Sequence, residues 1–203
     1  MRKCSKPENY IYLIMNKPCG YVCSAVSDSH KTVYELLTPE LQNLVSDAPR
    51  GCRLHTVGRL DCDTSGLLLI TNDGKFSHGV AADEVVTKTY RARLLSPVAQ
   101  ENQKSYISRA AAGLTLPPEK KYGEQFALPA ILEFETSCIC KITVHEGKFH
   151  EVRRIFRALG NEVSALERIA IGGLTLPKEI EPGQWRMLIK AEIDSLYSHQ
   201  QDC

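Results

Sequence analysis

The stretch Gly58–Gly74, GRLDCDTSGLLLITNDG, decides how the rest of the chain is organised. Five of the seven residues between Gly58 and Gly66 are charged or carry a hydroxyl group, namely Arg59, Asp61, Asp63, Thr64 and Ser65, and the uncharged run from Leu67 to Thr71 follows at once. An apolar run of this length, closed by Asn72-Asp73-Gly74, predicts a short buried strand that ends in a tight turn. We therefore expect a rigid strand to carry the polar turn.

Inside this turn, Asp61 and Asp63 stand close to Arg59 and beside the apolar run, where a carboxylate can be tuned for reaction. The two aspartates could hold Mg²⁺ for phosphoryl transfer, although that use favours an apolar strand before the first aspartate and here it follows. One aspartate could instead act as a nucleophile or base while an arginine holds it ionised. The aspartates and Thr64 could also only cap loop amides in a non-catalytic RNA-binding module. The pattern alone leaves these three functions open.

Length and composition predict a folded domain and exclude some partners. With 203 residues, 43% of them hydrophobic, the chain can form one large domain or two small lobes. Its 25 basic and 24 acidic residues give a net charge of +1, which excludes a polybasic tail, so any RNA contact must come from local patches. The N-terminal stretch MRKCSKPENYIYLIM holds only a short apolar run. We therefore expect no signal peptide and no membrane span. We expect the protein to be cytoplasmic.

The eight cysteines show neither a disulfide pattern nor a zinc pattern. They fall well below the density of about 8–10% that marks disulfide scaffolds, and no pair has the CxxC spacing. Cys138 and Cys140 would share one face of a strand as small hydrophobic residues. The sequence therefore predicts free thiols and no metal site.

The order of the predicted elements indicates the fold class. Strands mixed with short and medium helices, without regular alternation, predict an α+β domain with a mostly antiparallel mixed sheet flanked by helices. We expect one domain over residues 1–203, with possible lobes at 1–85 and 86–203 around a central cleft. Ser96-Pro97 predicts the start of a helix that ends at Gly113.

Three further segments carry candidate functional residues. Lys17, in a turn after the first predicted strand, could point at a phosphate or could be a solvated lysine. Strand alternation places Tyr90 on the same face as Ala92 and Leu94, as a half-buried tyrosine. The segment Leu116–Pro129 is predicted to be a long loop, either a flap over a ligand or an insertion.

The second informative stretch is EGKFHEVRRIFRALGN, from Glu146 to Asn161. Its apolar side chains recur at helical spacing and end at Gly160, which predicts an amphipathic helix. The opposite side of the helical wheel is basic and carries His150, Arg153, Arg154 and Arg157. A basic helix face can be a solvated surface, but arginines this dense after a glycine-containing turn are typical of phosphate contacts.

These motifs together resemble a known family. GRLDCDTSGLLLITNDG is similar to the signature of RNA pseudouridine synthases of the RsuA type, which modify uridines of bacterial ribosomal RNA. Five further segments match the family in the same order along the chain, namely Asn16–Gly20, Lys88–Tyr90, Glu146–Asn161, Leu166–Leu174 and Gly183–Arg186. The resemblance implies the pseudouridine synthase catalytic fold over the whole chain.

The resemblance also implies roles for single residues. Asp61 would be the catalytic aspartate, Tyr90 would pack against the target base, and Arg153 would pair with Asp61. Arg59 would help to occupy the space left by the flipped base, and Leu166 would form part of an apolar pocket wall. We also expect Thr64 to shape the turn, and Lys17, Thr64 and Arg154 to lie around the substrate. Because the isomerisation is neither a redox reaction nor a hydrolysis, we expect no cofactor and no metal.

Two departures from the family pattern bear on the substrate. Many relatives have glutamine where Glu151 stands, which makes this helix less cationic here. Relatives also commonly carry an N-terminal RNA-binding domain of the S4 type, and we expect none in this chain because only 57 residues precede Gly58.

The expected activity is that of a stand-alone pseudouridine synthase for ribosomal RNA. The lysine-rich loop, the segment Leu128–Glu133 and the run Glu146–His150 look closest to the branch that acts on small-subunit (16S) RNA. The large-subunit (23S) branch is the alternative. We expect the partner to be ribosomal RNA or a pre-ribosomal particle, and the protein to be a monomer.

Overall fold

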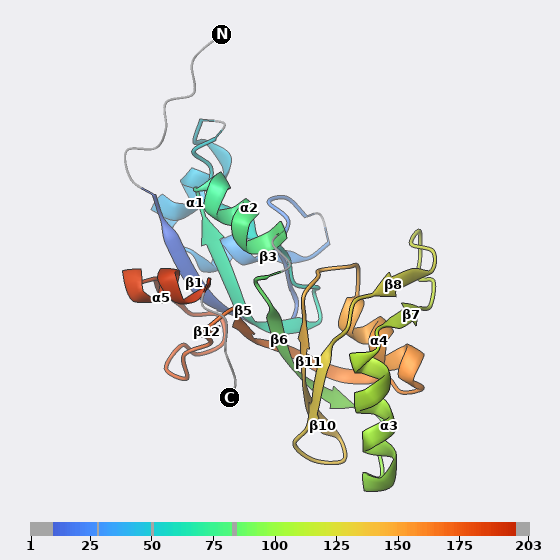
Figure 1. The fold of residues 1–203 in the computed structure, drawn as a ribbon. Coiled ribbons are helices and arrows are strands. Elements are labelled where there is room, and N and C mark those ends of the chain that lie inside the picture. Colours follow the sequence, from blue (N-terminus) through green and yellow to red (C-terminus); the bar gives the residue numbers. More distant parts are fainter. Residues whose placement is uncertain (1–9, 28, 50, 83–84, 198–203) are drawn as a thin grey trace.

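The structure is a computed structural model, and it describes residues 10–27, 29–49, 51–82 and 85–197. One nine-stranded sheet runs through the described chain, in the order β13-β1-β5-β11-β6-β10-β9, with β12 added to β11 and β4 to β5. Figure 1 shows the helices packed around its strands. Its strands are β1 (Tyr12–Lys17), β4 (His55–Val57), β5 (Thr64–Thr71), β6 (Lys88–Leu94), β9 (Ile131–Phe134), β10 (Ile139–Val144), β11 (Val163–Ile171), β12 (Leu174–Thr175) and β13 (Trp185–Met187). Two small sheets pair β2 (Tyr21–Val22) with β3 (Lys31–Thr32) and β7 (Leu114–Leu116) with β8 (Gln125–Ala127).

Short and medium helices flank the sheet. They are the 3₁₀ helix η1 (Val33–Leu36), α1 (Pro39–Ser46), α2 (Gly74–Ala82), α3 (Gln100–Ala111), α4 (Glu151–Leu159) and α5 (Lys190–Ser195). Within the large sheet, β11 is parallel to β5 and the other paired strands are antiparallel. The predicted α+β class, with a mostly antiparallel mixed sheet flanked by helices, is confirmed.

Strand β5 is the buried strand that the sequence predicted, and both of its faces are covered. Leu68 and Ile70 pack in one hydrophobic cluster with residues of η1 and α1. Leu67 and Leu69 point the other way and pack with residues of α2 and α5. The strand begins at Thr64, earlier than the apolar run, because its first residues pair with the parallel strand β11.

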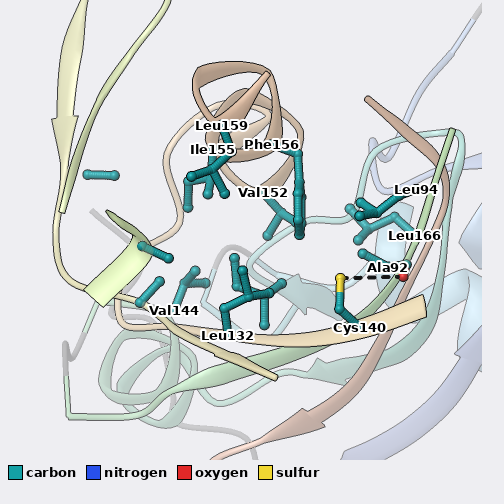
Figure 2. Close-up of a cluster of buried hydrophobic side chains, with 14 of the residues drawn as sticks. Ala92, Leu94, Leu132, Cys140, Val144, Val152, Ile155, Phe156, Leu159 and Leu166 are labelled. Atoms are coloured by element: carbon teal, nitrogen blue, oxygen red, sulfur yellow. Dashed lines mark hydrogen bonds between the residues drawn. The ribbon is translucent and has the colours of Figure 1, made fainter. Parts of the chain in front are cut away.

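The other half of the sheet is covered by α3 and α4. Figure 2 shows Val152, Ile155 and Phe156 of α4 pointing from the helix towards the sheet, where Leu132, Cys140 and Val144 lie. Burying apolar side chains of this size stabilises the fold by about 1.5–3 kcal/mol each. The predicted amphipathic helix is therefore confirmed, and it ends at Gly160, whose φ of 90° is left-handed.

Three details differ from the sequence predictions. The helix predicted from Ser96-Pro97 begins at Gln100, because Val98 is still hydrogen-bonded across the strand ends to Ser137 O. The predicted loop 116–129 contains β8, which pairs with β7 to form a hairpin. The segment that follows β11 returns to the first half of the molecule, where β13 pairs with β1. A division into lobes at residue 85 therefore does not follow the packing, and Glu84 itself lies outside the described residues.

Two sequence-level expectations concern cysteines and membranes. The six cysteines within the described residues are free thiols, and Cys4 and Cys203 lie outside them. In the part of the chain that the structure describes, the helices are too short or too polar to cross a bilayer.

Gly66 lies where the backbones of β5 and β11 approach closely, and it supplies a stability test. Its φ is +102°, and an added Cβ would lie 2.3 Å from Arg168 O. We expect Gly66→Ala to lower the free energy of unfolding by about 3 kcal/mol or more, from backbone strain and this clash. Thermal unfolding should show a Tm lower by roughly 6–12 °C.

Gly74→Ala is the matched control for this substitution. Gly74 is exposed at the start of α2, and an added Cβ would meet no atom within 4 Å. We expect its free energy of unfolding to change by less than about 0.5 kcal/mol. Equal Tm values for the two variants would contradict a tight β5–β11 contact.

Candidate active site

A cavity of about 250 Å³ lies where the two halves of the sheet meet. Its walls come from the turn before β5, from β6, from β11, and from the loop and first turn of α4. Six of the predicted site residues line it, namely Arg59, Asp61, Thr64, Tyr90, Arg153 and Leu166. The structure therefore brings together residues that are far apart in the sequence, while the other two, Lys17 and Arg154, lie elsewhere.

Lys17 shapes the turn from inside the protein. Its side chain is fully buried, and its ammonium donates hydrogen bonds to the carbonyl oxygens of Pro18 (3.1 Å), Asp61 (3.0 Å) and Thr64 (2.8 Å). An ammonium group has three N–H donors, so these three acceptors use all of them. Burial lowers the pKa of Lys17, and nearby cysteines and Asp61 oppose this shift. The prediction that Lys17 contacts a phosphate is therefore wrong.

Asp61 stands at the mouth of the cavity, with 38% of its side chain exposed. Its Oδ1 lies 3.6 Å from His150 Nε2. The other ring nitrogen, Nδ1, lies 2.8 Å from Glu119 Oε1, and because a carboxylate only accepts, we assign the proton to Nδ1. His150 has a left-handed φ of 48°, which is uncommon for a residue with a side chain and is typical of functional sites.

Glu119 fixes the orientation of the His150 ring. It accepts a second hydrogen bond, of 2.9 Å, from the guanidinium of Arg157. Burial acts against ionisation of Glu119, but the hydrogen bonds from His150 and Arg157 outweigh it and lower the pKa of this carboxyl group. An ordered line of charged and polar groups therefore runs from Arg157 through Glu119 and His150 to Asp61.

Arg153 contacts the turn through the other aspartate. Its guanidinium donates to Asp63 Oδ2 (2.9 Å), to Asp63 O (3.2 Å) and to Val163 O (3.0 Å). The expected pairing of Arg153 with Asp61 is therefore not the one in the structure. Among the described residues, the buried Nε of Arg153 has no hydrogen-bond partner. The contact with Asp63 also occupies one of the two carboxylates that a Mg²⁺ site in this turn would need.

Arg154 is fully buried and holds the β7–β8 hairpin against α4. Its guanidinium donates to Pro117 O (2.9 Å), Gly123 O (2.8 Å) and Gln125 Oε1 (2.6 Å). The substrate-binding prediction for Arg154 is wrong, because the helical wheel could not show that the hairpin covers this side of the helix.

Tyr90, Leu166 and Thr64 form the wall on the sheet side. Leu166 is paired with Thr64 on one neighbouring strand and with Ala92 on the other, so these side chains share one face of the sheet with Tyr90. Leu166 is buried and Tyr90 is half-buried, so the wall is apolar with one ring partly accessible. Arg59 is exposed at the rim.

Sequence reasoning missed two features of the site. It placed His150 on a basic surface and did not pair it with Asp61. It also missed the stack of aromatic rings formed by Tyr122, Phe149 and His150, in which adjacent centroids lie 4.5 and 3.8 Å apart. The only signal in the sequence was that Tyr122 and Phe149 each stand next to a glycine-containing turn, at Gly123 and Gly147.

Comparison with known proteins finds relatives of this chain. The family described as RNA pseudouridylate synthase matches residues 11–158. The ribosomal small subunit pseudouridine synthase A of Escherichia coli (strain K12) is 40% identical over 186 residues, which cover 91% of this chain and 73% of that protein. The protein of the same name from Vibrio cholerae is 40% identical over 187 residues, or 92% of this chain and 74% of that one. A crystal structure of a pseudouridylate synthase superposes with a TM-score of 0.79 at 37% identity, over 93% of this chain and 74% of the other.

Glu151, in the first turn of α4, gives a test of how the burial of a carboxyl group affects stability. It is buried, and burial raises its pKa, although Lys148 acts in the other direction. Because the folded-state pKa lies above the unfolded value, ionisation of Glu151 costs stability at neutral and higher pH. This cost disappears as the pH falls through the folded-state pKa. We expect Glu151→Gln to raise Tm at pH 8, with a gain that shrinks towards pH 5.

The matched control is Glu101→Gln, at an exposed position in the first turn of α3. Thermal unfolding of both variants across this pH range measures the effect, and the control should show no comparable gain. A Tm for Glu151→Gln equal to that of the parent at every pH would contradict a burial cost at this site.

Proposed function

The chain belongs to the RNA pseudouridylate synthase family and is a pseudouridine synthase, and we propose that it isomerises a uridine of small-subunit ribosomal RNA. Support for this substrate comes from the names of the relatives in Escherichia coli and Vibrio cholerae, which match more than nine-tenths of the chain. The observation that carries the proposal is the cavity itself, with a carboxylate at its mouth and an apolar wall behind it.

The shape of the cavity suits one extruded base. A uridine in folded RNA cannot react inside its stack, so it must leave it at a cost of a few kcal/mol and enter a pocket. Tyr90 and Leu166 offer an apolar wall to the uracil ring. Arg59, exposed at the rim, is in place to fill the gap that the base leaves in the RNA.

Asp61 is the group that we propose to carry the reaction. The N1–C1′ bond breaks, the uracil turns, and C5 bonds to C1′, while a proton leaves C5 and N1 gains one. An anionic Asp61 can attack the sugar or the base, or take a ribose proton. His150 Nε2 lies 3.6 Å from this carboxylate, and Arg153 is held two residues away on Asp63. The guanidinium of Arg153 can stabilise negative charge at the cavity mouth, and His150 does so only when Nε2 also carries a proton.

We also propose the setting in which the enzyme works. Its substrate is ribosomal RNA, free or in an assembling subunit, and it acts in the cytoplasm as a monomer. The net charge of +1 fits an enzyme that binds RNA through a local surface and not through its overall charge. Sedimentation of the protein with and without ribosomal RNA would measure both the oligomeric state and the partner.

Replacing Asp61 tests the proposed chemistry. We expect Asp61→Asn to lower pseudouridine formation by roughly a thousandfold or more, because the amide is neither a base nor a useful nucleophile. The assay is mapping of pseudouridine in small-subunit RNA after incubation with the parent or the variant. Thermal unfolding and RNA binding of the variant should stay close to those of the parent. Undiminished turnover would refute the role of Asp61.

A comparison of Arg153→Ala with Asp63→Asn tests what Arg153 does. If the guanidinium acts on the reacting groups, Arg153→Ala should reduce turnover by about 10²–10³-fold. Asp63→Asn removes the charge of a side chain that is mostly exposed, and should cost less than about tenfold. Equal losses in the two variants would show that Arg153 acts only by holding the turn through Asp63.

A further inference from the structure

We propose that Cys19 and Cys62 form a redox-sensitive pair, which a peroxide joins into a reversible disulfide. The bond links the turn after β1 to the turn that carries Asp61. Both cysteines are free thiols in the structure, which therefore describes the reduced form of this pair.

A backbone hydrogen bond holds the two cysteines side by side. The amide of Gly20 donates to the carbonyl oxygen of Cys62 at 2.8 Å. Cys19 is bonded directly to this amide, and in a trans peptide the N–H lies on the same side of the bond as the preceding Cα. Covalent geometry therefore keeps the Cα atoms of Cys19 and Cys62 within about 7 Å of each other. Disulfides usually join residues whose Cα atoms are about 4.4–6.8 Å apart, so the two backbones stand at a suitable spacing.

The ammonium of Lys17 fixes this arrangement from inside the protein. It binds Pro18 O and Asp61 O, the carbonyl groups that directly precede Cys19 and Cys62. Burial lowers the pKa of Lys17, and nearby cysteines, these two among them, oppose that shift. Both thiols are thus attached to turns that meet at one cation, and a neighbouring cation is a feature of reactive cysteines.

Access to solvent separates this pair from the third cysteine near Lys17. Cys19 is exposed and Cys62 is half-buried beside it, so a small oxidant reaches Cys19 first. Cys23 is buried, where its Sγ accepts a hydrogen bond from Leu60 N (3.4 Å) and donates one to Leu60 O (3.5 Å). Burial also raises the pKa of Cys23, which disfavours its thiolate. Cys62 is therefore the partner that remains for Cys19.

The reaction consumes one molecule of hydrogen peroxide for each disulfide. The thiolate of Cys19 attacks one peroxide oxygen, the O–O bond breaks, and the leaving hydroxide takes a proton to become water. The thiolate of Cys62 then attacks the sulfur of the resulting sulfenic acid, so that the S–S bond forms and a second water leaves. Two thiols lose two electrons in total, and the peroxide that accepts them is reduced to two waters. A small thiol reverses the bond by exchange.

The disulfide acts on the backbone beside Asp61. Its Cβ atoms must lie about 3.8 Å apart, which imposes one fixed geometry on Cys19 and Cys62. Asp61 shares a peptide bond with Cys62, so its carboxylate moves with that backbone, and a displacement of about 1 Å can cost roughly 100-fold in rate. This consequence rests on the proposed function, whereas the disulfide itself does not. Disulfides in cytoplasmic proteins are usually transient or redox-sensing, which fits the proposed setting.

Peptide mapping of the full chain tests the disulfide. The reduced protein is treated with hydrogen peroxide, the remaining thiols are blocked with N-ethylmaleimide, and a digest is analysed by mass spectrometry. We expect a linked Cys19–Cys62 peptide that forms at least about tenfold faster than any other linked pair, because the two turns hold the thiols in place. Dithiothreitol should remove the link, and treatment in urea should abolish the preference. Oxidation of the folded protein without this link overturns the proposal, and so does an equal preference in urea.

Serine variants identify the partners. Cys19→Ser and Cys62→Ser should each remove the linked peptide, while their Tm in the reduced state stays within about 2 °C of that of the parent. Cys138→Ser is the matched control, at a half-buried cysteine that precedes β10, and it should keep the link. A link that moves to Cys23 in Cys62→Ser, at the rate of the parent, would overturn the assigned pair.

Turnover separates this modification from the proposed function. The oxidised parent should form pseudouridine in small-subunit RNA roughly 10- to 100-fold more slowly, and dithiothreitol should restore the rate. Cys19→Ser should keep its turnover in peroxide. If the reduced parent forms no pseudouridine, the proposed function fails, and the peptide map still decides whether the disulfide forms. A complete disulfide with unchanged turnover would overturn the effect on Asp61.

Discussion

The buried ammonium of Lys17 is the constraint on which the turn that carries Asp61 depends. Burying a charge costs several kcal/mol unless hydrogen bonds compensate it, and each bond to a charged group contributes about 1.5–3 kcal/mol. The three carbonyl oxygens that Lys17 binds include those of Asp61 and Thr64, on either side of Cys62 and Asp63. The backbone of the turn is thus fixed from below, while the Asp61 side chain is left free to face the cavity.

Arg154 is a second buried cation that holds a backbone segment through hydrogen bonds, in the other half of the molecule. Its buried guanidinium satisfies carbonyl oxygens of a hairpin that has only a few backbone pairs of its own. A guanidinium suits this role because it carries five donors in a fixed plane and stays charged. Both cations come from the segments that looked like RNA contacts in the sequence, so the positive charge of these motifs serves the architecture as well as the ligand.

Features that depend on residues close together in the sequence could be predicted, and features that depend on distant segments could not. The buried strand β5 and the amphipathic helix α4 were predicted correctly because their patterns are local and strongly periodic. The direction of Lys17 and Arg154 depends on segments that lie tens of residues away, which no helical wheel or turn pattern contains. The gathering of Asp61, Tyr90 and Leu166 around one cavity was anticipated from the family resemblance, not from their spacing. The contact between His150 and Asp61 required the three-dimensional packing.

The line Arg157–Glu119–His150–Asp61 joins the two fixed parts of the site. The hairpin that carries Glu119 is held by Arg154, and the turn that carries Asp61 is held by Lys17, so His150 stands between two separately anchored bodies. The Glu119 contact, at 2.8 Å, is a hydrogen bond, whereas the Asp61 contact, at 3.6 Å, is too long to be one. The weakest link in the line is therefore the one at the cavity mouth. Under the proposed function, a nucleotide that enters there displaces only this contact and disturbs neither anchor, so the carboxylate stays in position while the base arrives.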